Sequence, residues 1–138
     1  LCEQHIESKA LILMGDDIYS KEDIAKLATY DNAILVLDEG EDGLKKKGQV
    51  VEKEGKLVGL NEGDVQTGTP SSLINTGAYC ISKKYFSYPK IKVSESEYGL
   101  PQTLASMSQE TEVHVLRGSW WIQVSTPECL VKAAKQLS

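Results

Sequence analysis

The chain has 138 residues, of which 41% are hydrophobic, and its formal net charge is −5 at pH 7. This length and apolar content are typical of one globular domain, over residues 1–138, that buries a core without disulfide bonds. Arg117 is the single arginine, which argues against a surface that binds the phosphate backbone of nucleic acid. The longest apolar run is too short to span a bilayer and no signal peptide precedes it, so we expect no membrane partner.

The three cysteines, Cys2, Cys80 and Cys129, lie far apart, and none belongs to a Cys-x-x-Cys pair. The sequence therefore predicts neither a zinc site nor a disulfide framework. Cys80 falls within an apolar strand pattern, so we expect it to be a buried small side chain. A reduced, cytoplasmic setting fits this use of cysteine best.

The first apolar run, at residues 10–14, ends at Gly15, Asp16 and Asp17. Such a run predicts a strand that is buried on both faces of a parallel sheet. Ligands of open α/β sheets bind beyond the carboxyl ends of the strands. Paired carboxylates at such an end suit Mg²⁺, which prefers oxygen ligands and often carries substrate phosphates. The alternative is a strand that ends in a solvated Asp-Asp turn.

A helix is predicted to follow this turn. Ser20 is suited to the N-cap, and Asp23 at the third helical position completes an approximate capping box. Residues 33–37 form a second apolar run after the helix. Strand, helix and strand in this order predict a βαβ unit with a right-handed crossover.

Residues 38–48 are predicted to form a charged loop, and we expect the basic run at residues 45–47 to be solvated. Residues 49–60 predict a hairpin with its turn at residues 54–55. Residues 61–72 are rich in Gly, Thr, Ser and Pro. A loop of that length is long enough to be functional or mobile.

The apolar run at residues 73–81 predicts another strand, which Asn75 and Gly77 interrupt. A glycine inside a strand marks either a bulge or the close approach of a ligand, and the bulge is favoured slightly here. Cys80 belongs to the same strand.

The last part of the chain predicts a short helix at residues 100–109 and strands at residues 112–116 and 120–124. His114 is expected to be structural, because no neighbouring residue completes a site. Thr126 is a predicted N-cap, and the proline that follows it suits the first position of a final helix.

Four segments in this order resemble the sugar-phosphate nucleotidyltransferases, which make nucleotide sugars such as dTDP-glucose. The resembling segments are residues 13–17, 55–62, 70–79 and 121–128. Their order and compatible spacing make the resemblance specific, and it covers almost the whole chain.

The resemblance implies an α/β fold with a Rossmann-like mixed sheet, of which this chain is the second half. It implies that a sugar 1-phosphate attacks the α-phosphate of an NTP and releases pyrophosphate. In such a transfer, positioning and charge neutralisation do most of the catalysis. It also implies the site residues: Asp16 as the catalytic Mg²⁺ ligand, Gln123 as the second metal ligand, and Glu62, Asn75 and Gly77 as substrate-binding residues.

The chain also departs from the family pattern. Gln123 stands where the family usually has aspartate, although one branch has asparagine, and the uncharged amide should bind a metal more weakly. Glu62 is followed by Gly63 and Asp64 rather than by Lys-Pro, so the lysine that neutralises the sugar phosphate is missing. Gln102 replaces a further aspartate. A site for several phosphates needs compensating positive charge.

The chain lacks the family's Gly-x-Gly-Thr-Arg loop, its activating lysine and its base-reading loop. We therefore expect residues 1–138 to be a portion of a longer domain, or the other half to come from another chain. The 138-residue piece by itself is expected to be inactive. An exposed strand edge and apolar surface would then favour self-association.

Two functions are consistent with these residues. The first is a divergent nucleotidyltransferase that uses an NTP and a sugar 1-phosphate. The second is a non-catalytic relative that keeps the fold for binding, regulation or assembly. This function is favoured by the absence of the lysine after Glu62 and of the aspartates at positions 102 and 123. A generic α/β pattern without family relationship is the remaining alternative, and we favour the first function.

Overall fold

The computed structural model describes residues 3–62 and 66–138. Its strands are β1 (Lys9–Ile12), β2 (Asp17–Tyr19), β3 (Ala33–Asp38), β4 (Gln49–Lys53), β5 (Lys56–Asn61), β6 (Leu73–Ser82), β7 (His114–Arg117) and β8 (Trp121–Gln123). The helices are α1 (Lys21–Leu27), α2 (Gly40–Gly43), α3 (Leu100–Met107) and α4 (Pro127–Leu137), with 3₁₀ turns η1 (Glu3–His5) and η2 (Lys83–Ser87).

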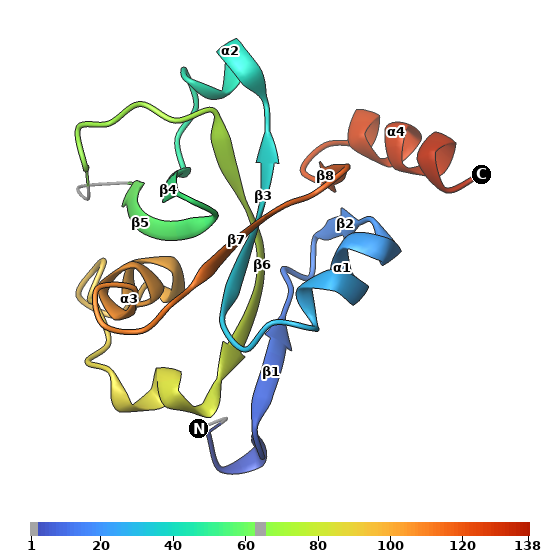
Figure 1. Cartoon of the computed structure of the whole chain (residues 1–138). Coiled ribbons are helices and arrows are strands. Elements are labelled where there is room, and N and C mark those ends of the chain that lie inside the picture. The colour runs from blue at the N-terminus through green and yellow to red at the C-terminus, as the bar shows by residue number, and fades with distance from the viewer. Residues whose placement is uncertain (1–2, 63–65) are drawn as a thin grey trace.

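Six of the strands form one mixed sheet in the order β1-β6-β3-β7-β5-β4, and β2 and β8 form a separate pair (Figure 1). The long central strand β6 runs antiparallel to both β1 and β3, while β3 runs parallel to β7. Hence β1 and β3 are parallel to each other, as a βαβ unit requires, but β6 lies between them. The predicted α/β fold with a mixed sheet is confirmed.

Strand β1 differs from its prediction. It is an edge strand of the sheet, and it pairs only with β6 among the described residues. Leu11, Leu13 and Met14 are 42%, 44% and 49% exposed. The prediction of a strand buried on both faces of a parallel sheet is therefore wrong. An apolar run shows that a segment is hydrophobic, but it does not show which other elements cover that segment.

The core is divided between the two faces of the sheet, and β3 contributes to both. Ile34 and Val36 pack on the face that is covered by α3 and η2. Ala33 and Leu35 pack on the opposite face, against Leu27 of α1 (Figure 1). Side chains of a strand alternate between faces, so a strand covered on both sides is apolar throughout.

Several local predictions are confirmed. Strands β4 and β5 form the expected hairpin, and both turn residues, Glu54 and Gly55, have positive φ (54° and 76°), as a tight hairpin turn requires. The side chains of Ser20 and Thr126 accept hydrogen bonds from the first turns of α1 and α4. The segment predicted as a loop at residues 38–48 contains the short helix α2.

Two side chains predicted to be structural are structural. Cys80 is 1% exposed. The His114 ring lies 4.8 Å from the ring of Tyr30, and its Nε2 lies 2.8 Å from a carboxylate oxygen of Glu112. Cys2, in contrast, lies outside the described residues.

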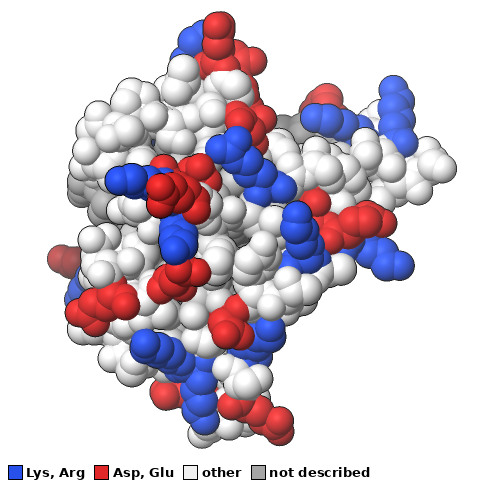
Figure 2. All heavy atoms as spheres, in the orientation of Figure 1, with Lys and Arg blue, Asp and Glu red and all other residues white. Residues whose placement is uncertain are grey.

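Charged side chains of both signs are interspersed over the face that Figure 2 shows. The single arginine, Arg117, lies 3.5 Å from Asp38 and 3.4 Å from Glu52, so its charge is locally balanced. In the described part of the chain, no helix has both the length and the apolar character needed to cross a membrane.

Candidate functional site

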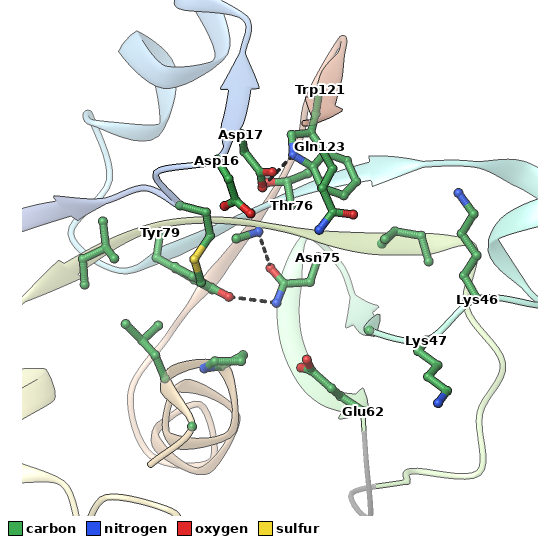
Figure 3. A pocket seen from close by; sticks show the side chains of 18 of the residues that line it. Asp16, Asp17, Lys46, Lys47, Glu62, Asn75, Thr76, Tyr79, Trp121 and Gln123 are labelled. Atoms are coloured by element: carbon green, nitrogen blue, oxygen red, sulfur yellow. Dashed lines mark hydrogen bonds between the residues drawn. The ribbon is translucent and has the colours of Figure 1, made fainter. Parts of the chain in front are cut away.

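One pocket of 760 Å³ gathers residues from widely separated segments of the chain. It lies beside the middle of β6, between the end of β1, the β2–β8 pair and the loop that precedes β4 (Figure 3). The five site residues predicted from the sequence all line it: Asp16, Glu62, Asn75, Gly77 and Gln123.

The β2–β8 pair forms the acidic end of the pocket. Asp17 is the register partner of Gln123, and the backbone N–H of Val124 donates to the carbonyl of Asp16 at 2.9 Å. The side chains of Asp16 and Gln123 are exposed, and no other described residue forms a hydrogen bond or ion pair with either side chain. Both are therefore available to a ligand.

Asp17 has a different environment from its neighbour. Its Oδ2 accepts hydrogen bonds from Trp121 Nε1 at 3.0 Å and from the Tyr19 hydroxyl at 3.3 Å. Its Oδ1 is buried without a partner among the described residues. Burial raises the pKa of Asp17, the hydrogen bond from Trp121 opposes this, and the charge of Asp16 raises it further. The buried contacts fix the strand pair and leave Asp16 to face the pocket.

A bulge in β6 shapes the floor of the pocket. Leu35 pairs with Ala78 and the next residue, Val36, pairs with Asn75, so two residues of β6 are left unpaired. Gly77, one of them, has a φ of 76°. A Cβ at this position would lie 2.6 Å from Cγ of Met14. The bulge that the sequence predicted is confirmed, and a protein side chain makes the close approach.

Asn75 is held in place by the bulge. Its Oδ1 accepts from the N–H of Gly77 at 3.0 Å, and its Nδ2 donates to the hydroxyl of Tyr79 at 2.8 Å. Tyr79 is 1% exposed, and burial raises its pKa to about 12, so the hydroxyl keeps its proton. An amide has two donors and two acceptor lone pairs, so Asn75 retains capacity for a ligand.

Glu62 lies directly after β5, on the side of the pocket opposite β8 (Figure 3). Its Oε2 is buried and has no hydrogen-bond partner among the described residues. Burial also raises the pKa of this carboxyl. An unpaired buried oxygen is costly, and a ligand hydroxyl would satisfy it. Gly63 and Asp64, which depart from the family pattern, lie outside the described residues.

Solved structures with the same fold come from several bacteria. A UDP-glucose pyrophosphorylase from Acinetobacter baumannii is similar with a TM-score of 0.74 at 15% identity, and covers 98% of this chain. An inositol-1-phosphate CTP transferase from T. maritima has a TM-score of 0.72 at 18% identity and 99% coverage. A protein described as a glucose-1-phosphate thymidylyltransferase, from Bacillus anthracis, has a TM-score of 0.69 at 19% identity and 98% coverage.

The chain has the fold of the sugar-phosphate nucleotidyltransferases. It matches only 53%, 57% and 57% of the lengths of these three proteins, and therefore spans about half of each. No protein-family profile matches the sequence, and no curated protein matches it significantly. The resemblance found in the sequence is thus confirmed at the level of the fold.

The acidic end of this nucleotidyltransferase fold offers oxygen donors to a cation. Asp16 supplies an exposed carboxylate and Gln123 an exposed amide, and both line the pocket (Figure 3). Within residues 3–62 and 66–138, no group of three or more His, Cys, Asp or Glu side chains is placed to hold a metal. This donor set fits Mg²⁺, which binds through one or two carboxylates and completes its shell with water and substrate phosphates.

The sequence prediction gave no role in the site to several residues that line the pocket, among them Tyr79, Lys46 and Lys47. Tyr79 follows Asn75 by four positions, and the alternation of a strand could have indicated that both lie on one face. Lys46 and Lys47 were expected to be solvated and are exposed, and both also line the pocket. No local pattern could have shown this, because the position depends on how the loop packs against β6.

Proposed function

We propose that the protein containing this chain joins an NTP to a sugar 1-phosphate, which forms a nucleotide sugar and releases pyrophosphate. The observation that supports this most is the convergence of four distant segments. Asp16, Glu62, Asn75 and Gln123, to which the sequence resemblance assigns roles, all border one pocket of a nucleotidyltransferase fold. A chance resemblance would have scattered them.

Each residue has a role that its environment supports. Asp16 and Gln123 would hold Mg²⁺, which when bound neutralises charge on the phosphate oxygens. Glu62 and Asn75 would accept and donate hydrogen bonds to the sugar hydroxyls, because each has unused hydrogen-bonding capacity in the pocket. Asp17 would keep the β2–β8 pair, and with it Asp16, in position through Trp121.

We also propose that residues 1–138 by themselves bind a sugar phosphate without turnover. The solved proteins that share the fold are almost twice as long, and the sequence contains no glycine-rich loop for nucleotide phosphates. Positioning both reactants is the main contribution that such an enzyme makes, so half of the site should bind but not catalyse.

The test is a pyrophosphate-release assay on the intact protein, with a matrix of NTPs and sugar 1-phosphates. Turnover of at least one pair is expected with Mg²⁺, and none is expected when the ion is removed by a chelator. Absence of turnover with every pair in the presence of Mg²⁺ would contradict the proposal.

A non-catalytic binding role is the second candidate, because Gln123 leaves the acidic end with a single exposed carboxylate. Calorimetric titration of the intact protein with an NTP and with sugar 1-phosphates separates the two. Binding without turnover favours the second role, and binding with turnover excludes it.

A further inference from the structure

The two aspartates and the two lysines that line the pocket lie at different ends of it. Asp16 and Asp17 lie at the β2–β8 end, whereas Lys46 and Lys47 lie at the far side, beyond Asn75 (Figure 3). We propose that the edge formed by Lys46 and Lys47 is an anion subsite, which binds a phosphate or carboxylate group of the ligand. This inference rests on the proposed function, and it places the compensating positive charge on a loop rather than after Glu62.

A buried glutamine fixes the backbone that carries the two lysines. Gln49 is 7% exposed, and its Nε2 donates to the carbonyls of Leu44 at 3.0 Å and Lys46 at 3.1 Å. Its Oε1 accepts from Nδ2 of Asn61 at 3.1 Å. The exposed loop is therefore tied to the β4–β5 hairpin, and Lys47 extends from a fixed backbone rather than from a free coil.

The same loop is hydrogen-bonded to β6 at Asn75. The carbonyl of Gly48 accepts from the backbone N–H of Asn75 at 2.9 Å. Gly48 has a φ of 73°, which favours glycine at this turn. Lys47 therefore directly precedes Gly48, whose carbonyl is hydrogen-bonded to Asn75, a proposed sugar-binding residue.

The two lysines differ in their partners. Lys46 forms an ion pair with Glu39. Lys47 has neither an ion pair nor a hydrogen bond to any other described residue. Among the described residues that line the pocket, these are the basic ones, while Asp16, Asp17 and Glu62 are among the acidic ones. Lys47 is therefore the basic pocket residue whose charge is left without an ion-pair partner among the described residues, and it lies away from Asp16 (Figure 3).

A second, smaller cavity supports the same assignment. It has a volume of 180 Å³, and both lysines line it together with Gln49 and Asn61. Both lysines thus line this recess as well as the main pocket. Hydrogen bonds from a cation to phosphate or carboxylate are roughly twice as strong as neutral ones.

The test is calorimetric titration of the 138-residue chain with glucose 1-phosphate, pyrophosphate, glucuronate and uncharged glucose. Lys47→Gln is expected to weaken binding of the anionic probe about tenfold, as loss of one charge-assisted contact would. Lys45→Gln is the matched control, because Lys45 belongs to the same basic run but does not line the pocket. Lys47→Arg should retain most of the affinity.

The probes distinguish a phosphate from a carboxylate ligand, and they test the anion subsite separately from the proposed function. If Lys47→Gln weakens the binding of glucose 1-phosphate, the subsite binds a phosphate group. If it weakens the binding of glucuronate, the subsite binds a carboxylate group on the sugar. Lysine-dependent binding of pyrophosphate, with no affinity for glucose 1-phosphate, would support the subsite and count against the proposed sugar substrate. If glucose 1-phosphate binds equally to the wild type, Lys46→Gln and Lys47→Gln, the subsite is overturned and the proposed function stands. Absence of binding by every anionic probe overturns the subsite as well.

Discussion

The carboxylates of the pocket differ in how far the protein has already satisfied them. Asp17 is bonded through Oδ2 to Trp121, whereas Asp16 is exposed and Glu62 has a buried oxygen without a partner among the described residues. Groups that folding leaves unsatisfied are the ones with capacity for a ligand. Asp17 therefore combines one oxygen that supports the β2–β8 pair with a second, Oδ1, that has no partner among the described residues, whereas Asp16 is exposed to the pocket.

Replacement of Asp16 tests the proposed metal role. In the intact protein, Asp16→Asn should reduce Mg²⁺-dependent turnover by about 100-fold or more, because the charge that holds the cation is removed while the shape is kept. Steady-state pyrophosphate release over a series of Mg²⁺ concentrations measures this. Asp31→Asn, at a carboxylate that is 85% exposed and outside the pocket, is the control. Equal activity of both variants would contradict the role.

Replacement of Glu62 tests its burial through the pH dependence of stability. Burial raises its pKa above the ordinary value of 4.5, so the folded state favours the protonated form. This stabilisation is complete below pH 4.5 and is lost as the pH rises through the folded-state pKa. Glu62→Gln should therefore be more stable than wild type at pH 7, by at most about 1 kcal/mol since the site is partly solvated.

Urea unfolding at pH 4 and at pH 7 measures the difference between Glu62→Gln and wild type. The gain in free energy of unfolding should be present at pH 7 and should shrink at pH 4. Glu95→Gln, at an exposed loop position, should show no such trend. A variant that is less stable than wild type at pH 7 would indicate that Glu62 has a stabilising partner.

At the scale of elements, the bulge in β6 shapes the middle of the site. It interrupts the pairing with β3 and turns Asn75 and Tyr79 toward each other and toward the pocket. Bulges commonly redirect a side chain beside an active site. The pairing of β2 with β8 has the corresponding role for Asp16 and Gln123.

The bulge requires glycine at position 77. Gly77→Ala should lower the free energy of unfolding by about 1–3 kcal/mol, because a non-glycine residue is strained at a φ of 76° and its Cβ would collide with Met14. Chemical denaturation measures the loss. Gly15→Ala is the matched control, since a Cβ there meets no atom within 4 Å. If both variants lost a similar free energy of unfolding, the bulge at Gly77 would not explain the loss.

At the scale of the whole molecule, edge strand β1 and helix α4 are among the described elements that leave apolar side chains exposed. Edge strand β1 exposes Leu11, and α4 lies at the periphery beside β8 with Leu130, Val131 and Leu137 more than half exposed (Figure 1). Ala133 is the buried residue of α4. Unpaired strand edges and apolar patches favour association.

We therefore expect residues 1–138 to self-associate as their concentration rises. Leu130→Glu should shift the equilibrium toward monomer, because it places a charge in the apolar face of α4. Lys132→Glu on the same helix introduces the same side chain at a lysine position, and it should change the mass much less. Light scattering over a concentration series measures the mass, and a monomer at every concentration would contradict the expectation.

Elements with a local signature were predicted well. The caps at Ser20 and Thr126, the hairpin turn at Glu54 and the bulge at Gly77 depend on residues close in sequence, and the structure confirms each. The placement of the strand at residues 10–14 was wrong, because coverage by other strands is a property of the whole sheet.

By itself, the sequence determined the helix caps, the local turns and the set of polar residues that stand out from apolar runs, but not strand β2 or helix α2. Only the tertiary structure decided that Asp16 and Gln123 lie at one end of a pocket and Lys47 at the other. The physical reason is that capping and turn formation use hydrogen bonds between near neighbours. Strand pairing, in contrast, brings distant residues together through backbone hydrogen bonds that carry no residue-specific signal.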